Sequence, residues 1–141
     1  MDKKTLESLI RRVLLEELGQ STHGVKKLAL PAETVTEAHR LDTGRPGDLV
    51  YTKDLLTLEE SPRLGVGLMV MERTTFPWTL NYDEVDYVIE GRLDILIGGD
   101  RVSAGPGEAL FIPKGSAIEF SVPDRARFLY VTYPADWQNQ G

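Results

Sequence analysis

The sequence has no cysteine, which excludes disulfide bonds and any chemistry that depends on a thiolate. Its two histidines, His23 and His39, are too isolated along the chain to suggest a metal-binding pair. His23 lies in a polar stretch, where a solvated side chain is expected. Since imidazole is the usual protein ligand of zinc, iron, nickel and copper, the sequence does not favour an ordinary transition-metal enzyme.

No hydrophobic run approaches the roughly 20 residues that a helix needs to span a bilayer, and the N-terminus lacks the apolar core of a secretory signal. We therefore expect no membrane association and a location inside the cell. The net charge of −6 comes from 22 acidic and 16 basic residues, which argues against a nucleic acid as partner.

The sequence also lacks the G-x-x-x-x-G-K-[ST] loop that cradles phosphates in many nucleotide-binding enzymes. Its glycine-rich segments, 98–100 and 103–107, lie between predicted strands. Neither precedes a helix, so neither provides the helix N-terminus that commonly binds phosphate. Any nucleotide site would have to be assembled in an unusual way.

Residues 1–18 have the pattern of an amphipathic helix, because apolar residues recur at three- and four-residue steps. Asp2 is a candidate N-cap and Gly19 a candidate helix end. A helix of this length is marginal in water unless its apolar stripe is buried. We expect the stripe to pack on the barrel, on a second copy, or in the groove of a partner. It comprises Leu6, Leu9, Ile10, Val13, Leu14 and Leu18.

Residues 19–29 are rich in glycine, serine, threonine and lysine without periodicity, and we interpret them as a linker. Residues 30–62 are irregular and are expected to wrap the domain as loops and edge strands. From Leu64 onward, short alternating apolar runs are separated by glycine and proline, which indicates antiparallel strands. Gly98 and Gly99 predict a two-residue hairpin turn. Residues 30–141 therefore form the predicted β-domain.

Two spacings mark residues 76–122. One is E-x6-G, from Glu84 to Gly91, and the other is G-x5-P-x-G, from Gly107 to Gly115. They resemble the paired motifs of the cupin family of small β-barrels, and this resemblance implies a double-sheet jelly roll. The predicted fold class is all-β, a cupin-type jelly-roll barrel with an N-terminal amphipathic helix.

The same resemblance indicates that the usual metal site is missing. Only the glutamate of the family's ligand set, Glu84, is present. Trp78 and Leu80, or the residue before each of them, occupy the two histidine positions of the first motif, and Ile118 occupies that of the second. Because these side chains offer a metal no lone pair, no transition metal is expected at the usual cupin site.

Glu84 is expected to point into the barrel, as the family's metal-binding glutamate does, and strand alternation sends Asp86 the same way. Two inward carboxyl groups could share a proton, hold Mg²⁺, or act as acid and base. Alternatively, Glu84 is structural and pairs with an arginine or the barrel wall. The aromatic candidates could equally be core residues, and the turn lysine could be merely solvated. Candidate catalytic residues are Glu84, Asp86 and Lys114; candidate substrate- or cofactor-binding residues are Trp78, Tyr82 and Tyr130.

Three longer runs, FPWTLNYDEVDYVIEG, FIPKGSAIEF and RFLYVTYPADWQ, resemble the EutQ family of ethanolamine-utilisation proteins. The resemblance covers most of the chain from about Leu64 to Gln138. It implies an accessory role in ethanolamine breakdown and an acetate kinase activity that uses acetate, ATP and Mg²⁺. It also implies a homodimer in the bacterial cytoplasm, within a bacterial microcompartment whose shell or cargo proteins would bind residues 1–18.

Two other interpretations stay open. The missing histidines and the missing phosphate loop favour a non-catalytic cupin module that helps to recruit or assemble the microcompartment. Alternatively, a metal could be held by shifted ligands such as Glu84, Asp86 and water.

Overall fold

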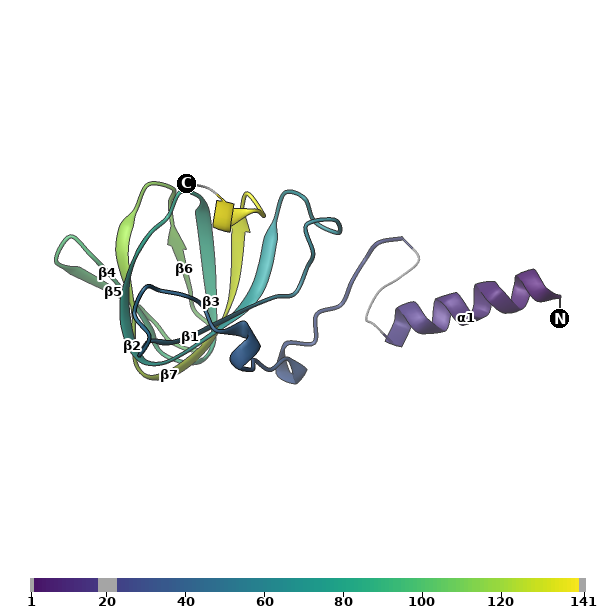
Figure 1. The fold of residues 1–141 in the computed structure, drawn as a ribbon, viewed down its shortest axis with the longest axis horizontal. Coiled ribbons are helices and arrows are strands. Elements are labelled where there is room, and N and C mark those ends of the chain that lie inside the picture. Colours follow the sequence, from purple (N-terminus) through teal and green to yellow (C-terminus); the bar gives the residue numbers. More distant parts are fainter. Residues whose placement is uncertain (1, 18–22, 140–141) are drawn as a thin grey trace. The chain divides into compact units, whose positions relative to one another are not determined.

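The structure, a computed structural model, describes residues 2–17 and 23–139 (Figure 1). The chain divides into two compact units, residues 1–33 and 34–141, and each unit is described by itself. Among the described residues, no helix combines the length and the apolar character needed to cross a membrane.

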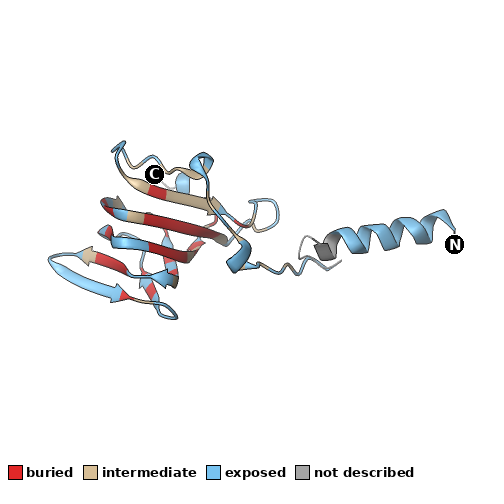
Figure 2. Cartoon of the chain, turned by 90° about the horizontal axis from the view of Figure 1, so that it is seen from below, coloured by how far each residue is buried: buried red, intermediate tan, exposed pale blue. Residues whose placement is uncertain are grey.

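The first unit contains the predicted amphipathic helix, α1 (Lys3–Glu17). The backbone N–H of Thr5 donates a 2.7 Å hydrogen bond to Oδ1 of Asp2, which confirms Asp2 as the N-cap. Residues 2–14 are all exposed (Figure 2), and the apolar side chains of the stripe among them are 47–58% exposed. The predicted helix end at Gly19 lies outside the described residues. A single 3-10 turn, η1 (Leu30–Ala32), follows.

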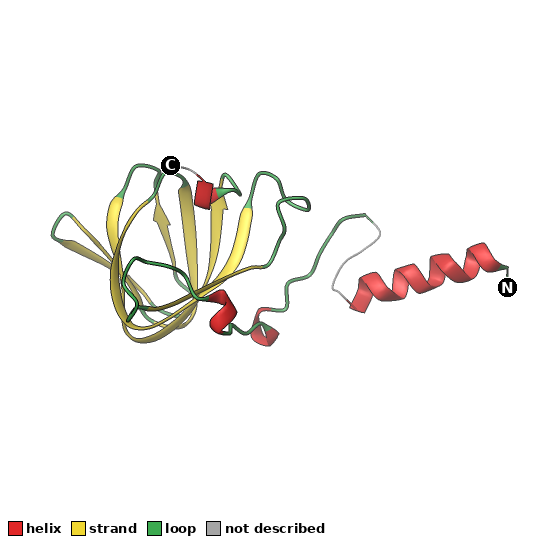
Figure 3. Ribbon diagram, viewed as in Figure 1, coloured by secondary structure: helices red, strands yellow, loops and turns green. Residues whose placement is uncertain are grey.

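The second unit is built from seven strands that curve around one core (Figure 3). The sheet runs β1-β2-β7-β3-β6, and β4 pairs with both β5 and β7. All of the pairings are antiparallel, as the short alternating runs of the sequence predict. The strands are β1 (Leu49–Asp54), β2 (Gly65–Thr79), β3 (Asp83–Gly91), β4 (Leu93–Ile97), β5 (Asp100–Ala104), β6 (Ala109–Ile112) and β7 (Ala117–Tyr133).

The two apolar runs 118–122 and 128–133 belong to one strand, because β7 is continuous through Pro123. Its long partner, β2, likewise continues past residue 73 to Thr79. The two strands bend together at a β-bulge, where Arg73 has a φ of 41° and the register shifts. Pro123 lies in the bulge, where a ladder hydrogen bond from its nitrogen is not required.

The hairpin turn predicted at Gly98 and Gly99 is confirmed between β4 and β5, where Ile97 lies opposite Asp100. Both glycines have positive φ angles, 56° and 85°, as a two-residue hairpin of this kind requires.

The core lies inside the barrel and is formed by the inward side chains of β2, β3, β4, β6 and β7. Its largest fully buried members come from different strands, so burial of one apolar interior holds the strands together. They include Phe76, Phe128, Met71, Leu93 and Val88.

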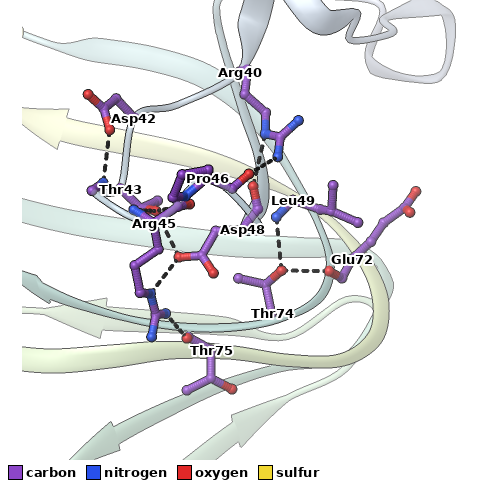
Figure 4. Close-up of polar contacts among 11 residues, drawn as sticks. Arg40, Asp42, Thr43, Arg45, Pro46, Asp48, Leu49, Glu72, Thr74 and Thr75 are labelled. Atoms are coloured by element: carbon purple, nitrogen blue, oxygen red, sulfur yellow. Dashed lines mark hydrogen bonds and ion pairs between the residues drawn. The ribbon is translucent and has the colours of Figure 1, made fainter.

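The segment before β1 is fastened to β2 by polar contacts (Figure 4). Arg45 donates from Nε to Oδ2 of Asp48 at 2.9 Å and from Nη2 to the carbonyl oxygen of Thr75. The N–H of Leu49 donates to Oγ1 of Thr74 at 3.0 Å. This fastening holds Leu41 against the barrel, where its N–H donates to the carbonyl oxygen of Val50.

Candidate functional site

The site begins with the alternation of β3. Glu84 and Asp86 are 5% and 0% exposed, whereas their neighbours Val85 and Tyr87 face outward. β3 lies between β6 and β7 in the sheet, and both acidic side chains are buried on its inner face. The sequence prediction that both carboxyl groups point inward is therefore confirmed.

These carboxyl groups have almost no hydrogen-bonding partners in the described part of the chain. Oε2 of Glu84 and both side-chain oxygens of Asp86 accept no hydrogen bond. Burying an unpaired carboxylate is costly, so the protonated form is favoured. Burial raises the pKa of Glu84 to about 7. Burial and the charge of Glu84 raise the pKa of Asp86 well above its usual range.

Asp94, on β4, shows the opposite environment for a carboxylate. Its side chain has no exposed surface, but it accepts hydrogen bonds from Nε and Nη2 of Arg92 at 2.9 and 2.8 Å. Arg101 donates a further bond. The hydrogen bonds from Arg92 lower the pKa of Asp94 to about 2. Unlike Asp94, Glu84 and Asp86 have carboxyl oxygens to which no described arginine donates a hydrogen bond.

A small cavity lies beside Glu84 in the barrel. Its free volume is about 20 Å³, which holds roughly one or two water molecules. Most of its wall is aromatic or apolar, and Asp86 lies outside the lining. The lining residues are Leu41, Thr52, Met69, Phe76, Trp78, Tyr82, Glu84, Phe120, Tyr130 and Trp137.

Four aromatic rings of the wall contact one another around Trp137. Its ring centre lies 6.1 Å from that of Trp78, 5.7 Å from Tyr82 and 6.2 Å from Tyr130. Nε1 of Trp78 donates to the hydroxyl of Tyr82 at 2.7 Å, and the hydroxyl of Tyr130 donates to Oδ1 of Asp54 at 2.7 Å. Burial raises the pKa of both tyrosines above the ordinary value, so both hydroxyls stay protonated at neutral pH.

The structure brings four of the six predicted site residues to the cavity wall: Glu84, Trp78, Tyr82 and Tyr130. The predicted catalytic Lys114 is exposed in the turn between β6 and β7 and does not line the cavity. Its backbone N–H donates to Oδ1 of Asp83 at 2.8 Å, which ties the turn to the start of β3. The functional roles of all six residues stay predictions.

Sequence reasoning missed Trp137, which belongs to the 3-10 turn η3 (Trp137–Asn139) and is 8% exposed. The turn follows the last strand, where no periodicity shows which way a side chain faces. The only signal was a tryptophan placed just after the final strand. Leu41 was missed because it lies in the irregular segment before β1.

A metal ion has few ligands here. The described residues contain no cluster of three or more histidine, cysteine, aspartate or glutamate side chains. Mg²⁺ commonly binds one or two carboxylates together with waters and phosphate oxygens. The cavity has no room for such a hydrated ion, and none for a nucleotide, so its residues do not fit Mg²⁺ with ATP.

The chain matches the family model described as ethanolamine utilisation protein EutQ over residues 1–139. The chain belongs to the EutQ family. It is 56% identical, over 151 aligned residues, to the acetate kinase EutQ of Clostridioides difficile strain 630, covering 99% of this chain and 96% of that relative. It is 45% identical to the acetate kinase EutQ of Salmonella typhimurium over 71% of this chain, but it spans only 43% of that longer relative.

Solved structures agree with the EutQ assignment. The structure of the Clostridium difficile EutQ protein has a TM-score of 0.84 and 65% identity, covering 86% of this chain and 88% of that one. A Cupin_2 domain of a transcriptional regulator from Enterobacter cloacae has a TM-score of 0.52 at 14% identity, covering 60% and 95% of the two chains. The second likeness shows the fold alone. The predicted cupin fold of this EutQ protein is thereby confirmed.

Proposed function

We propose that this EutQ protein is an acetate kinase that acts in bacterial ethanolamine breakdown. The observation that supports this most strongly is the 56% identity, over nearly the full length of both chains, to a relative named acetate kinase EutQ. In this reaction a carboxylate oxygen of acetate attacks the γ-phosphorus of ATP. A phosphorus–oxygen bond to acetate forms, the bond to the β–γ bridging oxygen breaks, and ADP leaves.

The cavity limits where this reaction would take place. A free volume of about 20 Å³ excludes a nucleotide, so ATP and its Mg²⁺ would bind outside the barrel interior. Lys114 supports a location at the nearby turn, because Ile112, two residues before it, lies opposite Glu84. An exposed ammonium group there suits the negative charge of a phosphoryl group. The step transfers no proton, so it requires no acid–base role from the buried Glu84 and Asp86.

The activity can be tested directly with the purified full chain. Acetate, ATP and Mg²⁺ are expected to yield acetyl phosphate, trapped with hydroxylamine as the hydroxamate. Lys114→Ala should lower kcat/KM by about tenfold or more, whereas Arg63→Ala, which removes another exposed cation, should not. Well-folded protein that forms no acetyl phosphate under these conditions would overturn the proposal.

A second role is favoured by α1. Its exposed apolar stripe suits a partner groove, and we propose that residues 1–18 recruit the protein to a bacterial microcompartment. This role is compatible with catalysis or could stand without it. Loss of co-localisation on deletion of the helix would support it, and unchanged localisation would contradict it.

The homodimer implied by the family resemblance is a further proposal, which sedimentation velocity of the full chain can check.

A further inference from the structure

The carboxyl groups at and beside the cavity lack hydrogen bonds. The carboxyl groups of Glu84 and Asp86 have three oxygens without a hydrogen-bond donor in the described part of the chain. Two polar hydrogens near the cavity are already used, because Trp78 donates to Tyr82, and Tyr130 donates to Asp54. A ligand with N–H groups can therefore donate to the carboxyl group of Glu84, whose Oε2 accepts no hydrogen bond in the described part of the chain.

The cavity also has no positive charge to balance its acids. Its described lining includes no lysine, arginine or histidine. Besides Glu84 and Asp86, the titratable groups that face the site are Tyr82, Tyr130 and, behind Tyr130, Asp54. Each of these groups is neutral when protonated and negative when it has lost its proton, so none of them can carry a positive charge. An anion is therefore disfavoured when the pair is ionised, and a cation is favoured.

The aromatic wall of the cavity also favours a cation. The rings of Trp78, Tyr82, Tyr130 and Trp137 surround the space beside Glu84. The face of an aromatic ring carries partial negative charge and attracts organic cations. The rings also offer an apolar surface to methylene groups. A bare metal ion gains less here, because the site lacks a third carboxylate or histidine ligand among the described residues.

We propose that this cavity binds a small primary organic ammonium ion, with its N–H groups donating to the carboxyl group of Glu84, which lines the cavity next to the buried Asp86. Its one or two carbon atoms would lie against the aromatic rings. The free volume of about 20 Å³ excludes a larger cation unless the wall moves. This ligand site goes beyond the proposed kinase activity and does not depend on it.

Binding of the ammonium ion should be coupled to the loss of a proton from the carboxyl groups of Glu84 and Asp86. Burial raises the pKa of Glu84 to about 7, so the pair gains its first negative charge near that pH. The affinity for an ammonium ion should then rise by about tenfold per pH unit up to pH 7 and level off above it. An acid such as acetic acid, bound through the protonated pair, would show the opposite dependence.

Calorimetric titration of the full chain with methylammonium and with ethanolamine, from pH 6 to 8.5, tests the proposal. We expect saturable binding that strengthens with pH, and no binding of tetramethylammonium, which has no N–H donor. Absence of binding by both primary ammonium ions would overturn it, as would affinity that falls with pH.

Matched variants locate the site. Glu84→Gln with Asp86→Asn keeps the side-chain shapes and should weaken binding by about tenfold or more, whereas the exposed Glu119→Gln should bind like the wild type. Equal affinity in all three proteins would overturn the proposal, and the pH dependence of the wild type tests it even if the double variant does not fold. Binding without acetyl phosphate formation would contradict only the kinase proposal. Kinase activity without binding of an ammonium ion would contradict only the proposal of an ammonium site.

Discussion

Glu84 and Asp86 place two carboxyl groups inside the barrel without a cationic partner, and this makes the stability of the fold depend on pH. The pKa of Glu84 is about 7 in the folded chain, against an ordinary value of 4.5. Between these two values the folded chain keeps a proton that the unfolded chain has lost. The free energy of unfolding should therefore fall by roughly 3 kcal/mol as pH rises from 4.5 to 7.

Urea unfolding at a series of pH values measures this fall directly. The raised pKa of Asp86 should add to this fall. Glu84→Gln with Asp86→Asn should flatten the dependence and make the barrel more stable than the wild type at pH 8. Glu119→Gln, an exposed control, should keep the wild-type slope. Equal slopes in the wild type and the double variant would show that the pair does not hold a proton.

Asp94 should act in a different and lower pH range. Its pKa is lowered to about 2, so it stabilises the fold above about pH 3.8 and loses this contribution as pH falls through 2. Arg92 and Arg101 are both 53% exposed, and solvent screens the interaction. Asp94→Asn should lower the free energy of unfolding at pH 7 by about 1–2 kcal/mol. Asp100→Asn is the exposed control, and an equal effect of the two would contradict this role.

At the level of the strands, the glycine of the E-x6-G spacing has a steric role. Gly91 ends β3 with a φ of 81°, and a Cβ there would lie 1.9 Å from the carbonyl oxygen of Arg125 on β7. Gly107, in the turn before β6, has a similar φ of 85° but nothing within 4 Å of such a Cβ. The first glycine is therefore required by close backbone approach, and the second by backbone conformation alone.

Alanine substitutions separate these two requirements. Gly107→Ala should cost about 1 kcal/mol, the penalty of the left-handed conformation. Gly91→Ala adds a clash with backbone and should cost about 2–4 kcal/mol. Chemical denaturation of both variants measures the difference. Equal losses would mean that β3 and β7 separate easily at this point.

The strands also show what the sequence could and could not predict. Alternation predicted the inward side chains of β3, including Glu84 and Asp86, because the side-chain period of a strand is two. The continuity of β7 was not predicted, since Pro123 normally ends a strand and the bulge that accommodates it is formed with β2. Trp137 could not be predicted at the cavity, because its position depends on how the chain turns back after β7.

At the level of the whole molecule, the two units have different kinds of surface. The barrel unit buries its apolar side chains around one core, whereas the stripe of α1 is exposed. Deleting residues 2–18 should therefore leave the midpoint of barrel unfolding unchanged, as measured by urea denaturation followed through tryptophan fluorescence. Both tryptophans, Trp78 and Trp137, lie in the barrel and report on it. A lower midpoint would show that the helix contributes to barrel stability.

The central claim is that the barrel interior holds a carboxyl pair with a shared proton and no positive partner. Carbon-13 NMR of the side-chain carboxyl groups measures this directly, with Glu84→Gln and Asp86→Asn used to assign the signals. The carboxyl group of Glu84 should titrate near pH 7, and that of Asp86 should titrate well above its ordinary range. If both titrate below pH 5, like exposed carboxyl groups, the pair is not shielded from solvent as described and the account of the site is wrong.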